Sequence, residues 1–181
     1  MARLGGEGMP TSVIKVSSEA LIHDFFRDNL NHFPKLEDAA EKLAQTLPLE
    51  TENQYLFICE RLKRKHNIEV KIQRVEEMGD TLRIFNRGEK EIWLSEAFDS
   101  INRKFQLLHL ICLIEEEKLL DKITLDMGDR SPLTINRCKV ELANYFAAAA
   151  LMPYEAFLSM AESVAYDIDR LAIRFGVSVE Q

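Results

Sequence analysis

Apolar residues recur every three or four positions over most of this chain, which is the spacing of amphipathic helices. Proline residues at positions 34, 48 and 153 separate several of these stretches, because proline cannot continue a helix interior. The chain is therefore predicted to be mainly helical. The expected helices cover approximately residues 18–31, 36–46, 51–66, 100–118, 135–152, 154–162 and 166–175.

Small polar residues and one glycine mark the expected helix ends. Ser17 or Ser18 is positioned to cap the first helix, and Thr134 to cap the helix that starts at residue 135, because a hydroxyl oxygen accepts from the free N–H groups of a first turn. Gly176 follows the last helix and suits the left-handed conformation that often ends one. These positions set the predicted boundaries.

Between the third and fourth helices the apolar period changes to two, which is typical of half-buried strands. Residues 68–75 (IEVKIQRV) alternate in this way, and residues 81–86 and 90–95 form two further short segments joined through Asn86 and Gly88, a hairpin signal. The helix at 100–118 is almost continuously apolar between Phe105 and Ile114 and is expected to be buried on most sides. The sequence thus predicts an α+β fold, a helical domain whose small, three-stranded, mostly antiparallel sheet packs on a buried central helix.

Composition indicates one folded unit that does not bind nucleic acid unaided. The 181 residues are 46% hydrophobic and 29% charged, enough for one core, so residues 17–181 are predicted to form one domain after a flexible tail at 1–16. The net charge of −7 argues against a DNA-binding surface on this segment, since such binding requires a basic face.

Cysteine usage and hydropathy predict a cytoplasmic protein. Cys59, Cys112 and Cys138 are odd in number, widely spaced and set within helical patterns, as expected of buried free thiols in a reducing compartment. No apolar run has the length of a membrane span, and the first residues lack the apolar core of a signal peptide. No membrane association is predicted.

Three segments carry a resemblance to known bacterial regulators. Residues 144–157 (NYFAAAALMPYEAF) look like the signature of the ImmA/IrrE metallopeptidase domain on the helix after its zinc-binding helix. Together with residues 103–115 (RKFQLLHLICLIE) and 166–181 (YDIDRLAIRFGVSVEQ), they resemble the effector domain of short-chain fatty acyl regulators of the XRE family. The resemblance implies a zincin-like fold, and DNA contact only through a helix-turn-helix domain that this chain does not include.

The catalytic motif of the peptidase family is degenerate here. HExxH places two imidazoles on one helix face with a glutamate beside the metal-bound water. This chain has His109, but Leu110 stands at the general base and Leu113 at the second ligand. The third ligand maps to about Val140, with Glu141 one position along and turned by about 100°. We predict no catalytic residue, metal or cofactor, and a buried His109 bonded to backbone or a neighbouring side chain.

A retained cleft without metal has the form of a small-molecule pocket. The resemblance implies a short-chain acyl-CoA or related carboxylate as effector, which requires cationic groups. The candidate ligand-binding residues are His109, Arg103, Arg83, Asn144 and Tyr145. Taken singly, each arginine is better explained by a surface ion pair, and the tyrosine by packing at the core edge.

The sequence leaves three alternative hypotheses about function. The preferred hypothesis is a non-catalytic effector-sensing and oligomerisation domain of a bacterial transcriptional regulator, expected to be a homo-oligomer. The second is a residual metallopeptidase that uses His109, Glu141 and a distant histidine. The third is a protein-interaction scaffold without a small ligand.

Overall fold

The computed structural model describes residues 11–48, 51–128 and 131–179, with side chains from residue 18 onward. The fold class is confirmed: most elements are helices, and three short strands form one sheet. In chain order the elements are α1 (Thr11–Asp28), α2 (Pro34–Ala44), α3 (Thr51–His66), β1 (Glu69–Gln73), α4 (Val75–Met78), β2 (Arg83–Asn86), β3 (Glu91–Ser95), α5 (Ser100–Glu115), α6 (Glu117–Thr124), the 3-10 helix η1 (Leu125–Met127), α7 (Pro132–Leu151), α8 (Tyr154–Ser163) and α9 (Ile168–Phe175).

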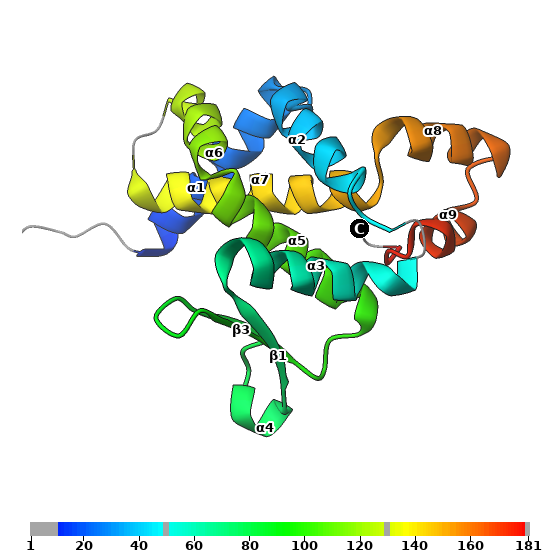
Figure 1. Cartoon of the computed structure of the whole chain (residues 1–181). Coiled ribbons are helices and arrows are strands. Elements are labelled where there is room, and N and C mark those ends of the chain that lie inside the picture. The colour runs from blue at the N-terminus through cyan, green and yellow to red at the C-terminus, as the bar shows by residue number, and fades with distance from the viewer. Residues whose placement is uncertain (1–10, 49–50, 129–130, 180–181) are drawn as a thin grey trace, which may run out of the picture.

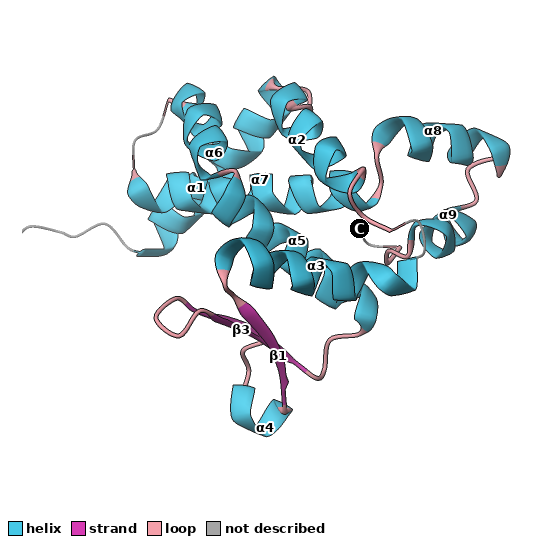
Figure 2. Ribbon diagram, viewed as in Figure 1, coloured by secondary structure: helices cyan, strands magenta, loops and turns pink. Residues whose placement is uncertain are grey.

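The helices α5 and α7 cross at the centre of the molecule. Helices α1, α2 and α6 pack against α7, while α3 packs against α5 and contacts β1. Figures 1 and 2 show the sheet on the α3 side of the molecule, with α8 and α9 at the end of α7. The predicted central helix is therefore sandwiched between a helical layer and the layer that contains the sheet.

The core is apolar and drawn mainly from α2, α3, α5, α7 and β3. Its largest fully buried apolar side chains are Phe146, Leu36, Ile58, Leu62, Ile92, Leu94, Leu107, Leu108, Ile111, Leu120 and Leu142. Burying each of these side chains stabilises the fold by about 1.5 to 3 kcal/mol. The small Ala143, Ala147 and Ala150 on α7 are buried too and allow neighbouring helices to approach closely.

The sheet is mixed, and here the expectation of mostly antiparallel pairing was wrong. Its strand order is β1-β3-β2, with β1 parallel and β2 antiparallel to β3. After β1 the chain forms α4 and returns on the far side of β3, so β2 becomes an edge strand. Alternating residues predict that a segment is a strand, but they do not specify its neighbour.

Two predicted helix caps proved wrong. Helix α1 begins at Thr11, within the segment assigned to a tail, while residues 1–10 lie outside the described residues. Ser18 is consequently in mid-helix and buried, and its hydroxyl hydrogen-bonds Thr134 on α7 at 3.0 Å. Helix α7 already starts at Pro132, so Thr134 joins two helices instead of capping one. The limits of the domain stay a prediction.

The predicted helix at 100–118 is two helices. Asp99 caps α5 by accepting the Asn102 N–H at 2.7 Å, and α5 ends at Glu115. Glu116, with φ −107° and ψ 20°, departs from helical geometry, and α6 starts at the next residue. Gly176 follows α9 in the expected left-handed conformation, with φ 61°.

Candidate functional site: the central cleft and His109

Helix α5 carries His109 into the interior of the molecule. Its residues 107–112 are all buried, and the His109 side chain is 1% exposed. A titratable ring at such a position requires hydrogen-bond partners for both nitrogens. The hydrogen-bond partners of His109 therefore determine the protonation state of its ring.

Both ring nitrogens of His109 have a partner. Nδ1 lies 2.8 Å from Nη1 of Arg83, and the ring also hydrogen-bonds the backbone of Val140 on α7. Arginine only donates, so Nδ1 is the acceptor and Nε2–H is left to donate to the Val140 carbonyl. Burial first, and then the Arg83 charge, lower the pKa of His109 to about 4, against the smaller opposing effect of the Val140 bond. His109 is thus a neutral, fully bonded imidazole.

Arg83 reaches His109 from the first position of β2. Its register partner on β3 is the buried Leu94, and opposite residues lie on the same face of a sheet, so Arg83 faces α5. Its Nη1 also donates to Oε1 of Gln106 at 2.8 Å. Burial lowers the pKa of Arg83 from its usual value. The structure therefore brings together two of the predicted site residues, Arg83 and His109.

A cavity of about 590 Å³, which we call the central cleft, lies beside this group. Its lining combines aromatic and small apolar side chains with amides, a hydroxyl and one carboxylate. The lining residues are Phe26, Asn102, Phe105, Gln106, Glu141, Asn144, Tyr145, Ala148 and Ser178. The predicted residues Asn144 and Tyr145 belong to the cleft, and Arg83 adjoins it through Gln106.

The Tyr145 hydroxyl is committed to holding α2. It donates to Oε1 of Glu37 at 2.5 Å and accepts the Phe33 N–H at 3.4 Å. The ring packs edge-on against Phe33, with 5.4 Å between centroids. Burial and then the Glu37 bond raise the pKa of Tyr145, so the phenol stays protonated. Tyr145 therefore contributes mainly the surface of its ring to the cleft, because its hydroxyl is bonded to Glu37 and Phe33.

Arg103 lies away from the cleft, contrary to the sequence expectation. Its Nη2 donates to the Glu96 carbonyl at 3.2 Å, at the end of β3, and it is not among the cleft residues. Position 103 is six residues before His109, which rotates it by about 120° from His109 on a helix. Helical geometry alone indicates this difference.

Sequence reasoning missed Gln106, which links Arg83 to the cleft. Gln106 precedes His109 by three residues and so shares its helix face. Spacing from His109 was the signal that could have found it. Phe26 on α1 has no comparable signal, because it reaches the cleft only through packing of α1 on α7.

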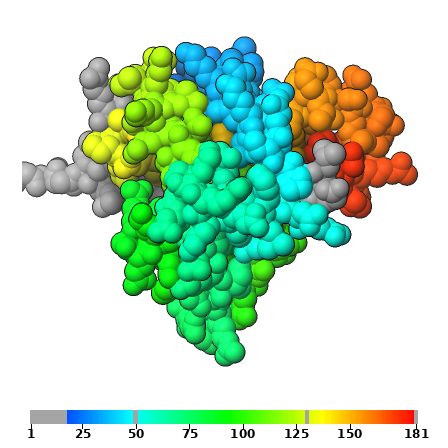
Figure 3. Space-filling model, viewed as in Figure 1, coloured from blue at the N-terminus to red at the C-terminus, as the bar shows by residue number. Residues whose placement is uncertain are grey.

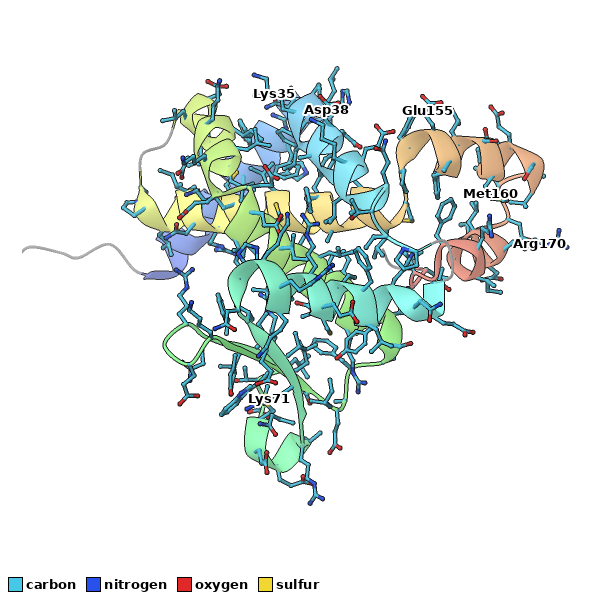
Figure 4. All side chains as sticks on the ribbon, viewed as in Figure 1. Lys35, Asp38, Lys71, Glu155, Met160 and Arg170 are labelled. Carbon is cyan, nitrogen blue, oxygen red and sulfur yellow. The ribbon has the colours of Figure 1, made fainter. Side chains whose placement is uncertain are left out.

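A second cavity, of about 480 Å³, lies on the opposite face of α5. It is lined by residues of α2, α3, α5, α6 and α7, and Figure 3 shows α2, α3 and α6 meeting on the face drawn there. Its rim carries charges of both signs, including Lys35 and Asp38 on α2, labelled in Figure 4. Arg61 there donates twice to Glu115, at 3.0 and 2.7 Å. None of the predicted site residues lines this cavity.

Comparison with known proteins decides the family. The model of the peptidase M78 family, described as the IrrE N-terminal-like domain, matches residues 63–181, which include α5, α7 and the sheet. The chain belongs to the IrrE N-terminal-like family. This confirms the resemblance inferred from the segments around His109 and Asn144.

Relatives of this IrrE-like chain are transcriptional regulators. The HTH-type regulator PrpR of Mycobacterium tuberculosis is 30% identical over 160 residues, covering 88% of this chain and 32% of the relative. A propionyl-CoA carboxylase regulator of Cereibacter sphaeroides is 38% identical over 106 residues, covering 58% and 23%. A solved Mycobacterium tuberculosis transcriptional regulator has a TM-score of 0.82 and 28% identity, covering 90% of this chain and 49% of that chain. The chain spans a third or less of these curated relatives' length.

The zinc that a peptidase of this family implies does not fit the residues present. Leu110 and Leu113 are apolar, and Glu141 lies 3.4 Å from the amide of Asn144 on the exposed side of α7. Burial raises the pKa of the Cys112 thiol, which disfavours the thiolate that a metal requires. Within the described ranges no three His, Cys, Asp or Glu side chains converge on a metal position.

Membrane insertion finds no support in the described helices. None of them combines the length and apolar character needed to cross a bilayer.

Proposed function

We propose that this IrrE-like chain is the effector-sensing domain of a bacterial transcriptional regulator and has no peptidase activity. The effector would be a short-chain acyl-CoA or a related carboxylate metabolite, bound in the central cleft. DNA contact would come from a helix-turn-helix domain outside this chain, because the net charge of −7 disfavours a phosphate-binding face.

The proposal that this chain is not a peptidase rests on the surroundings of His109, whose ring is buried and fully hydrogen-bonded. A zinc peptidase needs a metal-bound water and an adjacent general base. Here both ring nitrogens are bonded, and the next residue along α5 is a leucine that is 4% exposed. The chain thus lacks a group at this position that could activate water.

The central cleft supports the sensing part. Its volume of about 590 Å³ is in the range of small-molecule sites. Phe26, Phe105 and Ala148 provide apolar surface for a short acyl chain, and the amides of Gln106 and Asn144 provide polar contacts. Arg83 donates to the lining residue Gln106 and would meet an anionic group. The name of one relative, a propionyl-CoA carboxylase regulator, agrees with this chemistry.

Calorimetry and thermal shift with propionyl-CoA, butyryl-CoA, free CoA and propionate test the proposal. A specific ligand at about 100 times its Kd should stabilise the fold by about 2.7 kcal/mol. Asn144→Ala should weaken binding about tenfold, the loss expected for one or two hydrogen bonds. The matched control is Asn53→Ala on the exposed surface of α3, which should bind as the unmodified protein does.

The two alternatives predict different outcomes. Stoichiometric zinc in the purified protein, together with peptide cleavage that His109→Ala abolishes, would show a residual peptidase. Absence of any stabilisation by acyl-CoAs or carboxylates would favour the interaction scaffold. We also propose a homo-oligomer, which light scattering coupled to size exclusion tests directly; a monomer at all concentrations would contradict it.

A further inference from the structure

The contacts of His109 join three elements of the fold through one continuous set of hydrogen bonds. Gln106 on α5 accepts from Arg83 on β2 at 2.8 Å, and the same Nη1 lies 2.8 Å from Nδ1 of His109. The His109 ring in turn bonds the Val140 backbone on α7. The resemblance to zinc peptidases places their third metal ligand at about Val140, so this bond lies where the resemblance would place a metal between the two helices.

The donor and acceptor properties of these groups allow only one arrangement. A guanidinium is always protonated and has no acceptor, so it takes the lone pair of Nδ1. Neutral imidazole then carries its hydrogen on Nε2, which donates to the Val140 carbonyl. In this arrangement His109 has no lone pair left for a metal ion.

We propose that Arg83 is the positioning residue that replaces the metal in this domain: it fixes the Nε2–H form of His109, which braces α5 against α7 and closes the former metal position. The inference goes beyond the sensor function and does not depend on whether the cleft binds an effector. Arg83 acts through His109 and touches no reacting group.

The position of Arg83 suits this role. It is the first residue of β2, an edge strand whose sheet neighbour is β3, so its side chain ties the exposed edge of the sheet to the central helix. Lysine has one ammonium group and lacks the rigid fork of a guanidinium. The two hydrogens of one nitrogen, Nη1, serve both acceptors, Gln106 and His109, and the guanidinium plane fixes their directions, whereas an ammonium group rotates freely.

The first test is the ring state of His109 by long-range 1H–15N NMR of the intact chain. We expect the Nε2–H tautomer with an acceptor-type Nδ1 shift and a slowly exchanging Nε2 proton. Arg83→Met should move the Nδ1 resonance and speed exchange of the ring proton, while Arg74→Met, an exposed arginine beside the same sheet, should change neither. A protonated Nδ1 in the unmodified protein, or spectra identical in Arg83→Met, would overturn the proposal.

The second test asks whether Arg83 keeps metal out. Leu113→His supplies a second imidazole four residues after His109, the spacing at which two histidines chelate a metal on one helix face. We expect Leu113→His combined with Arg83→Met to bind zinc about tenfold or more tightly than Leu113→His combined with Arg74→Met, as measured by competition with a chromogenic chelator. The two double variants remove the same charge, so equal affinities would contradict the proposal. If Leu113→His fails to fold, the NMR result decides alone.

Discussion

The central helix α5 meets α7 and β2 in different ways. Toward α7 the contact is mainly apolar, with Leu142, Ala143 and Phe146 fully buried against a helix whose residues 107–112 are also buried. Toward β2 the link is polar, made by Arg83 to Gln106 and His109. The apolar contact is non-directional and tolerates exchange of similar residues, whereas the polar one depends on each donor meeting its acceptor. The first builds the fold, and the second fixes the hydrogen-bond partners of His109.

Removing the apolar contact should have the largest effect. Phe146→Ala leaves a cavity under α5 and should lower the free energy of unfolding by about 3 to 5 kcal/mol. Urea denaturation measures it. Leu133→Ala, on the same helix but 55% exposed, is the control and should cost less than about 1 kcal/mol. Similar losses in both variants would show that α7 does not hold the core.

The polar contact should appear in the pH dependence of stability. The folded state keeps His109 neutral down to a pKa of about 4, whereas the unfolded chain protonates it near 6.5. The unfolded state therefore binds more protons between these values, and stability should fall by about 3 kcal/mol as the pH is lowered from 6.5 to 4. Urea titrations across this window measure the fall. His109→Gln should flatten it, and an unchanged profile in that variant would contradict the assignment.

A second polar cluster of α5 should respond in a lower pH range. Burial opposes ionisation of Glu115, but bonds from Arg61 and His66 outweigh it and lower its pKa to about 2 from 4.5. The stability it contributes is present above 4.5 and lost as the pH falls toward 2. Glu115→Gln should cost about 1.5 to 3 kcal/mol at pH 7 and remove that acid dependence. Glu116→Gln is the matched control, and equal losses in the two variants would refute the special role of Glu115.

The smallest expected loss of stability comes from the hydrogen-bonded hydroxyls of Ser18 and Thr134, which lie between α1 and α7. Ser18→Ala leaves the buried Thr134 hydroxyl without its partner at 3.0 Å and should cost about 1 kcal/mol. Adding Thr134→Val removes both hydroxyls, so the double variant should lose less than the sum of the single losses. Thermal unfolding of the unmodified protein, the two single variants and the double variant measures these losses as a double-mutant cycle. Additive losses would mean that the two hydroxyls do not interact.

The helices could be read from the sequence because helical periodicity is local. The spacing of apolar residues predicted ten of the described elements, seven helices and three strands, near their observed positions. Helices α4 and α6 were missed, since four and eight residues carry too little periodic signal. The first helix was started too late, because two serines were interpreted as caps although one of them is buried against α7.

At the candidate site, the sequence indicated which residues of the zinc motif are replaced, and the structure showed which side chains contact one another. Leu110 and Leu113 stand where the resemblance places the general base and the second metal ligand, and the sequence therefore predicts that both are missing. Arg83 and Arg103 looked equivalent in the sequence, yet one bonds His109 and the other turns to the Glu96 carbonyl. Tyr145 was a candidate ligand-binding residue, and only the structure shows that its hydroxyl is bonded to Glu37.

By itself the sequence predicted a mainly helical domain that resembles the IrrE type, with leucines at the positions where that resemblance places the glutamate and the second histidine of HExxH. Identity and spacing along one helix are sufficient for that conclusion, because a helix fixes which side chains share a face. Tertiary structure alone decided the order of the strands, the pairing of Arg83 with His109 and the bond to Val140. Those contacts join residues 26 and 31 positions apart, and their formation depends on how separate elements pack.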